Sequence, residues 1–239
     1  MITLAVTDDE ATAKTLGFPT ITREGFEGHP EDFDKSLVIR WGNSRRYYNR
    51  RGVRQEFKNV ANPSAAIRLN CMKQEARAAF SAVVNVPKKY ENSVPRGKMA
   101  VVRPLSHEAG IDFQIVTGPY IIPWGYYASE FIETDTEYRV WFAHDRTFAG
   151  QRVPIHGESR VRPCRSNWAY AYRDVSAKLH KDTLAAAKAI GLNFGAADVL
   201  IKGGKHYFLE LNSGVSVDAP TPRRFFQEAI ESYAESRGF

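Results

Sequence analysis

Cysteine is scarce in this chain of 239 residues: Cys71 and Cys164 are isolated, which excludes a disulfide-rich scaffold and a cysteine-based metal site. No apolar run reaches the roughly 18 residues that a membrane-spanning helix needs. No basic stretch precedes an apolar one at the N-terminus, so the sequence predicts no secretion signal. Apolar residues make up 43% of the chain, which is enough for a substantial core and excludes a disordered protein. We therefore expect a reduced, cytoplasmic, globular protein with no membrane partner.

The net charge of +6 is unevenly distributed. Residues 1–35 contain eight acids and three bases, so they sum to −5 and the rest of the chain carries +11. A basic body favours an anionic ligand, such as a nucleotide, a nucleic acid or an acidic substrate. Composition does not choose among these.

Hydrophobic patterning predicts an α+β fold without strict βαβ alternation. A helix of about 20 residues is expected to follow Asn62-Pro63, with Asn62 as its N-cap. Further helices are expected over 176–190 and from Thr221-Pro222 onward. Strands are expected at residues 4–6, 37–41, 99–103, 113–117, 126–132, 138–143, 147–153, 196–201 and 206–211.

The last two strands form a predicted hairpin around Gly203-Gly204. Alternation along a strand places Glu210 and Asn212 on one face, where their oxygens suit a hard cation such as Mg²⁺. A plain two-residue turn would set Asp198 opposite Leu209, on the wrong face. An odd-length loop or a bulge would set Asp198 opposite Glu210, and two facing carboxylates are destabilising unless a cation lies between them. A metal site therefore requires the odd loop or the bulge, and the alternative is an ordinary amphipathic hairpin with exposed acids.

Residues 191–199 (GLNFGAADV) and 207–214 (YFLELNSG) resemble the closing motif of the ATP-grasp superfamily of carboxylate–amine ligases. Examples are D-alanine–D-alanine ligase and the ribosomal-protein glutamate ligases, and short members encoded by bacteriophages share an Arg-Trp-Gly like residues 40–42. The resemblance implies ATP and Mg²⁺ as cofactors, with the metal held by Asp198, Glu210 and Asn212. It also implies two α+β lobes that grip the nucleotide, with a shortened N-terminal lobe over 1–60, a small lobe over 61–127 and a C-terminal lobe over 128–239.

Residues 129–140 resemble the hinge between the two lobes of this family. The resemblance implies that Glu130, Phe131 and Ile132 border the adenine and that Glu137 takes the ribose hydroxyls. Upstream, residues 101–110 resemble the strand and loop that close over the phosphates. The family usually has lysine where this chain has Arg103, and arginine keeps the charge and offers a planar fork for phosphate oxygens.

Arginines at 152, 160, 162 and 165 lie where the family places cations against the transferred phosphoryl group. We expect Arg152 and Arg162 to be catalytic. D-alanine–D-alanine ligases carry an arginine two residues before the metal-binding aspartate, and this chain has Ala196 there. Lys73 occupies a position near a family lysine, but we interpret it as a solvated helix residue.

The function implied is ATP-dependent amide bond formation through an acyl phosphate, between small-molecule or peptide substrates. The main alternative rests on residues 40–54, which contain six arginines, three aromatic residues and no acid. Such a cluster can hold single-stranded nucleic acid, although its arginines could instead meet the acidic first 35 residues. An ATP-grasp kinase is a third possibility. The sequence does not indicate an oligomeric state.

Overall fold

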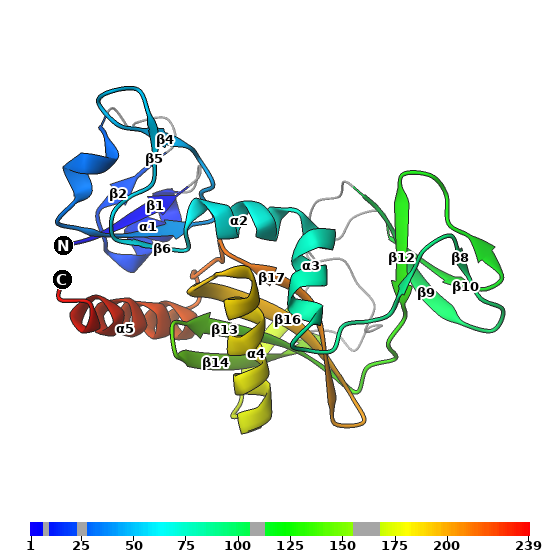
Figure 1. Ribbon diagram of the computed structural model, residues 1–239. Helices are drawn as coiled ribbons and strands as arrows, with labels where there is room; N and C mark the ends of the chain where they lie inside the picture. The colour runs from blue at the N-terminus through cyan, green and yellow to red at the C-terminus, as the bar shows by residue number, and fades with distance from the viewer. Residues whose placement is uncertain (7–9, 23–27, 106–112, 155–167) are drawn as a thin grey trace.

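The computed structural model describes residues 1–6, 10–22, 28–105, 113–154 and 168–239, and it confirms the predicted α+β class. Figure 1 shows an N-terminal lobe and a small lobe on opposite sides of a C-terminal lobe. The boundary expected between residues 127 and 128 falls inside a strand of the small lobe, β12 (Tyr126–Glu130).

The N-terminal lobe is a four-stranded parallel sheet in the order β2-β1-β3-β6. The sequence predicted two of these strands and missed the short helix α1, because a helix of two turns shows too little periodicity. A 3₁₀ turn lies between β2 and β3 in the chain. A small antiparallel hairpin, β4–β5, lies between β3 and β6. The elements are β1 (Ile2–Val6), α1 (Glu10–Leu16), β2 (Thr20–Ile21), η1 (Pro30–Phe33), β3 (Leu37–Trp41), β4 (Tyr47–Tyr48), β5 (Arg54–Gln55) and β6 (Val60–Ala61).

The small lobe is an antiparallel sheet in the order β10-β9-β12-β7, beside a two-stranded pair β11-β8. One face of the sheet contributes to a small apolar core, which Val94 of β8 completes: Tyr90, Val94, Ala100, Val102 and Ala128. The other face carries Arg103 opposite Tyr127, because these two residues are register partners. The strands are β7 (Lys89–Tyr90), β8 (Ser93–Val94), β9 (Met99–Pro104), β10 (Gln114–Thr117), β11 (Tyr120–Ile121) and β12.

The C-terminal lobe is built on a five-stranded antiparallel sheet in the order β15-β14-β13-β16-β17. One face packs on α2 (Ser64–Cys71), α3 (Lys73–Ser81) and α4, and one end of the other face packs on α5 and the N-terminal lobe. The strands and the last two helices are β13 (Thr136–Ala143), β14 (Arg146–Pro154), β15 (Trp168–Tyr172), α4 (Ala177–Ile190), β16 (Phe194–Lys202), β17 (Lys205–Asn212) and α5 (Pro220–Ser236).

The single long helix predicted after Asn62 is wrong: the segment forms α2 (Ser64–Cys71) and α3 (Lys73–Ser81). Met72 separates them with a non-helical ψ of 80°, and neither glycine nor proline marks the break. Figure 1 shows α3 turned away from the direction of α2, beside β17, which is an edge strand of the sheet. No helix within the described residues is both long and apolar enough to cross a lipid bilayer.

Asn62 is not the N-cap that the sequence predicted. The cap residue is Pro63, and the first amide of α2, at Ser64, donates to Glu56 Oε2 instead (2.9 Å). Asn62 is fully buried with φ of 53°, and its side-chain amide bonds the N-terminal lobe at Arg40 O and the C-terminal lobe at Phe194 N and O. This side chain therefore fastens the two lobes together.

Candidate functional site

The β16–β17 hairpin contains the bulge that a metal site requires. Gly203 and Gly204, both at positive φ, make a two-residue turn, and pairing from Lys202↔Lys205 to Val199↔Phe208 is regular. The register then shifts by one residue, so that Asp198 lies opposite Glu210 and Ala196 opposite Asn212. Leu209 is the extra residue of the bulge. The predicted condition for a shared acidic face is thus confirmed.

Asp198 is buried between two arginines. Arg139, its register partner on β13, donates from Nε and Nη2 to the two carboxylate oxygens at 3.0 and 3.1 Å. Arg152 of β14 donates from Nη2 to Asp198 Oδ1 at 3.3 Å. Burial alone would raise the pKa of Asp198, but the two guanidinium groups outweigh it and hold that pKa below its ordinary value. Asp198 is therefore an ionised carboxylate whose charge is already compensated.

Glu137 lies on the same face, two residues before Arg139, and forms an ion pair with Arg152. Burial raises the pKa of Glu137 above its ordinary value, and Arg152 offsets this only in part. The predicted alternation of Glu137, Arg139 and Trp141 along one strand face is confirmed by their contacts and register. Glu137, to which the resemblance assigns the ribose, thus contacts Arg152, which we expect to be catalytic.

Glu210 and Asn212 complete the acidic edge. Glu210 accepts a hydrogen bond from Lys73 Nζ at 3.1 Å, while the Lys73 side chain stays exposed to solvent, as we expected of a helix lysine. The break at Met72 places Lys73 at the start of α3, next to β17. Asn212 has a buried side-chain amide nitrogen that finds no hydrogen-bond partner among the described residues. A buried N–H group without an acceptor is costly, so this position fits an anionic or polar ligand.

The three residues offer oxygens of the hard type that Mg²⁺ prefers: two facing carboxylates and one amide. Among the residues that the structure describes, no group of three or more histidine, cysteine, aspartate or glutamate side chains could hold a metal. A cation here would therefore depend on the Asn212 amide and on oxygens from a ligand, which is how Mg²⁺ is usually held beside phosphates. The donor set fits Mg²⁺ bound together with a nucleotide.

Two further arginines approach from α3 and the small lobe. Arg103 of β9 and Arg77 of α3 each have a buried Nε without a hydrogen-bond partner in the part of the chain that the structure describes. Burial lowers the pKa of Arg77, and the positive charge of Arg103 acts in the same direction, while Tyr127 and Glu210 oppose the shift. Two partly buried guanidinium groups close enough to repel, each with an unpaired N–H, form a local excess of positive charge that an anion would compensate. The sequence prediction included Arg103 and missed Arg77, although Lys73 and Arg77 are spaced one helical turn apart.

The segment predicted to be the hinge runs from β12 of the small lobe into β13 of the C-terminal lobe. Glu130 ends β12, and its amide donates to Lys88 O at 2.7 Å. The amide of Phe131 donates to Met99 O at 3.0 Å, so it is not free for an adenine. Ile132 and the residue after it lie beyond the strand and remain the candidates for that contact. The loop at 106–112, expected over the phosphates, lies outside the described residues.

The arginine that D-alanine–D-alanine ligases place before the aspartate has no room in this chain. Ala196 is fully buried opposite Trp141, whose ring contacts Phe148 and Tyr170. Arg152 projects onto the same face from β14 and already reaches Asp198. Arg162, the other predicted catalytic residue, lies outside the described residues.

No protein-family model and no curated protein matches the sequence. Similar solved structures include the ATP-grasp ligase PsnB complexed with minimal precursor (14% identity, TM-score 0.67, 96% of this chain and 98% of that chain), which is also known with Mg and ADP. Macrocyclase MdnC bound with precursor peptide MdnA from Microcystis aeruginosa MRC is similar (14%, 0.61, 96% and 99%). So is D-alanine–D-alanine ligase from Bacillus anthracis (11%, 0.55, 98% and 92%). The chain has the ATP-grasp fold.

Proposed function

We propose that this chain is an ATP-dependent carboxylate–amine ligase that requires Mg²⁺. The observation that carries the proposal is the bulge at Leu209, which sets Asp198 opposite Glu210 on the strand face that also bears Glu137, Arg139 and Arg152. Two facing carboxylates need positive charge beside them; Arg139, Arg152 and Lys73 supply it here, and Mg²⁺ would add to it when a nucleotide is bound. The ATP-grasp fold supplies the context in which the ligand is a nucleotide with its metal.

Each group has a role in the proposal. Asp198, Glu210 and Asn212 would hold Mg²⁺, which neutralises phosphate charge when bound. Lys73 and Arg103 would contact phosphate oxygens, and Glu137 the ribose. Residues 130–132 would border the adenine. Arg152 and Arg162 would stabilise the charge that develops on the transferred phosphoryl group.

The proposed reaction has two steps. A substrate carboxylate oxygen attacks the γ-phosphorus of ATP, the bond to the bridging oxygen breaks, and ADP leaves. An amine nitrogen then attacks the carbonyl carbon of the acyl phosphate, phosphate leaves, and the nitrogen loses a proton. Neither step needs a nucleophile from the protein, so alignment and charge compensation by the arginines and Lys73 supply most of the rate enhancement.

We propose a peptide as the carboxylate or amine substrate. Two of the similar structures, PsnB and MdnC, are complexes with precursor peptides, and their TM-scores of 0.67 and 0.61 exceed the 0.55 of D-alanine–D-alanine ligase. The aromatic cluster of Trp141, Phe148 and Tyr170 beside Ala196 also differs from the arginine that D-alanine–D-alanine ligases carry at that position. The proposed location is the cytoplasm, where ATP is available.

The nucleotide half of the proposal is tested by thermal unfolding with the analogue AMPPNP. Wild-type protein should be stabilised by AMPPNP with Mg²⁺, and Asp198→Asn and Glu210→Gln should lose that stabilisation. Glu228→Gln on α5, whose carboxylate pairs with Arg224 at the surface, is the matched control and should retain it. Folded wild-type protein that shows no AMPPNP effect would overturn the proposal.

The ligase half is tested by measuring the ADP that forms when the protein is given ATP and a pool of short peptides. Release that requires both a carboxylate and an amine supports ligation. Release with a phosphorylated product and no amine requirement would identify a kinase instead.

A further inference from the structure

The hairpin β4–β5 and its flanks, residues 45–54, form a basic projection on the N-terminal lobe, which we name the arginine hairpin. All five of its arginines are exposed to solvent: Arg45, Arg46, Arg50, Arg51 and Arg54. The sixth arginine of the sequence cluster, Arg40, is fully buried and belongs to the core. The cluster therefore divides into one structural residue and five surface charges that the proposed ATP site does not use.

Arg40 and Asn49 hold this hairpin in shape. The Arg40 guanidinium binds Glu56 and the carbonyl oxygens of Asn43 and Arg45, which fixes both ends of the projection. At the tip, Asn49 Oδ1 accepts from the amides of Arg51 and Val53 (3.0 and 2.9 Å). The arginines are thus presented on a preorganised turn, which lowers the entropy that a partner must overcome.

The acidic first 35 residues neutralise little of this charge within the described parts of the chain. Arg50 pairs with Asp32, and its amide also bonds Glu31. Arg46, Arg51 and Arg54 form no ion pair with any acid that the structure describes. Like charges held this close repel, and a ligand of opposite sign would relieve that repulsion.

The aromatic residues argue against a single-stranded nucleic acid. Stacking platforms need exposed rings, but Trp41 and Tyr47 are 4% and 3% exposed. Tyr47 packs on Phe57 and under the Arg40 guanidinium. Tyr48 is the remaining ring of the cluster, at 51% exposure. The surface therefore offers arginine forks rather than a row of rings, and such forks match carboxylates bidentately.

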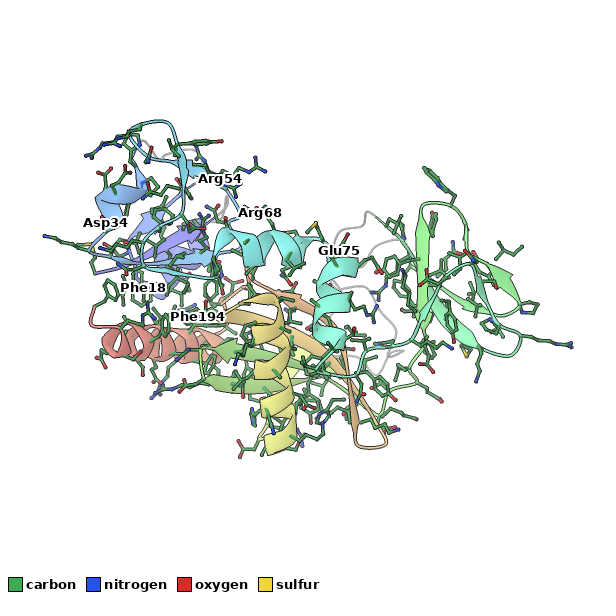
Figure 2. The ribbon with its side chains drawn as sticks, viewed as in Figure 1. Phe18, Asp34, Arg54, Arg68, Glu75 and Phe194 are labelled. Carbon is green, nitrogen blue, oxygen red and sulfur yellow. The ribbon has the colours of Figure 1, made fainter. Side chains whose placement is uncertain are left out.

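We propose that the arginine hairpin docks an acidic segment of a peptide partner, with carboxylates on Arg46, Arg51 and Arg54. This docking is independent of the proposed ligase chemistry, because it uses neither ATP nor the acids of β16 and β17. Figure 2 shows Arg54 on the same upper edge of the molecule as Arg68 of α2. Helix α2 has eight residues, about 12 Å, and leads to Lys73 at the site. A peptide held by the hairpin could thus extend along α2 toward the site.

The test is fluorescence anisotropy of a fluorescein-labelled peptide of alternating Glu and Ser. The triple variant Arg46→Gln/Arg51→Gln/Arg54→Gln should bind about tenfold more weakly, since three exposed charge pairs are lost. The matched control removes the same charge from exposed lysines elsewhere, as Lys98→Gln/Lys181→Gln/Lys205→Gln, and should bind like wild type. Thermal unfolding checks that both triple variants fold.

An equal loss in both triple variants would overturn the proposal, because binding would then follow net charge alone. So would the absence of binding to wild type at low salt. Tighter binding of an oligothymidylate that competes with the peptide would replace it with the nucleic-acid alternative. Binding that persists in Asp198→Asn, with AMPPNP stabilisation lost, would separate the docking surface from the ATP site.

Discussion

Arg139→Met measures how strongly the buried acid of the site depends on its arginine. Asp198 is 5% exposed, and Arg139 supplies two of its three arginine hydrogen bonds. Removal of one partner from a buried ion pair leaves an uncompensated charge and costs about 3–5 kcal/mol. Arg152 remains at 3.3 Å, which favours the lower end of that range. For a chain of this size the melting temperature should fall by roughly 6–20 °C.

The loss should depend on pH in a direction that the structure fixes. The folded-state pKa of Asp198 is depressed, so its contribution to stability is present above the unfolded-state pKa and disappears as the pH falls through the folded-state value. Without Arg139 that pKa rises, so wild type and variant should differ most at neutral pH and converge in acid.

The assay is thermal unfolding followed by circular dichroism across this pH range. Arg224→Met is the control, since Arg224 pairs with Glu228 at a side-chain exposure of 83% and its loss should leave the melting temperature close to that of wild type. An Arg139→Met variant that melts with the Arg224→Met control would refute the idea that a buried ion pair organises the site.

Three further outcomes are expected. Arg77→Ala should weaken ATP binding about tenfold and leave adenosine binding unchanged in calorimetry, because its unpaired Nε lies beside Arg103 and an anion would satisfy both; equal losses for both ligands would contradict this. Ala196→Arg should unfold at a lower denaturant concentration, with a loss of about 3 kcal/mol or more, because the site is fully buried opposite Trp141; normal stability would show unrecognised space there. Asn62→Ala should lower the free energy of unfolding by about 3 kcal/mol in the same measurement, because the hydrogen bonds between the lobes are lost. Asn62→Gly should lose about 1 kcal/mol less, because glycine tolerates the φ of 53° better than alanine does. A larger loss for glycine than for alanine would contradict this role of the backbone conformation.

Local pattern was sufficient for the parts of the fold with clear periodicity. The helix over 176–190 was predicted well because Ser176 caps it and Gly191, at positive φ, ends it, and both signals are local. Alternation along the strand fixes the face of Glu210. The sequence therefore showed that a metal site with Asp198 would need a bulge or an odd-length loop in this hairpin. Whether the register shifts was not readable from the turn glycines, since it depends on β13 packing Arg139 against Asp198.

Errors arose where tertiary contacts outweigh local signals. Asn62-Pro63 has the composition of a helix start, but Asn62 bonds both lobes, and the first amide of α2 is satisfied by Glu56, eight residues upstream of Ser64. Met72 breaks a continuous helical pattern without glycine or proline, since α3 must turn to pack on α4 and β17. That same break brings the exposed Lys73 to Glu210, a contact that the helical pattern of the sequence did not predict.

The charges of the site argue for a ligand of defined sign. On the sheet face, the acids Asp198, Glu210 and Glu137 are matched by Arg139, Arg152 and Lys73, so this part is neutral as it stands. A nucleoside triphosphate together with its magnesium ions is also close to neutral, so its entry preserves that balance. Arg77 and Arg103 would contact its phosphates, so the site together with this nearly neutral nucleotide complex would keep a net positive charge excess. A carboxylate substrate, and the acyl phosphate formed from it, would bring the negative charge that this excess lacks, which favours an acid over a neutral hydroxyl acceptor.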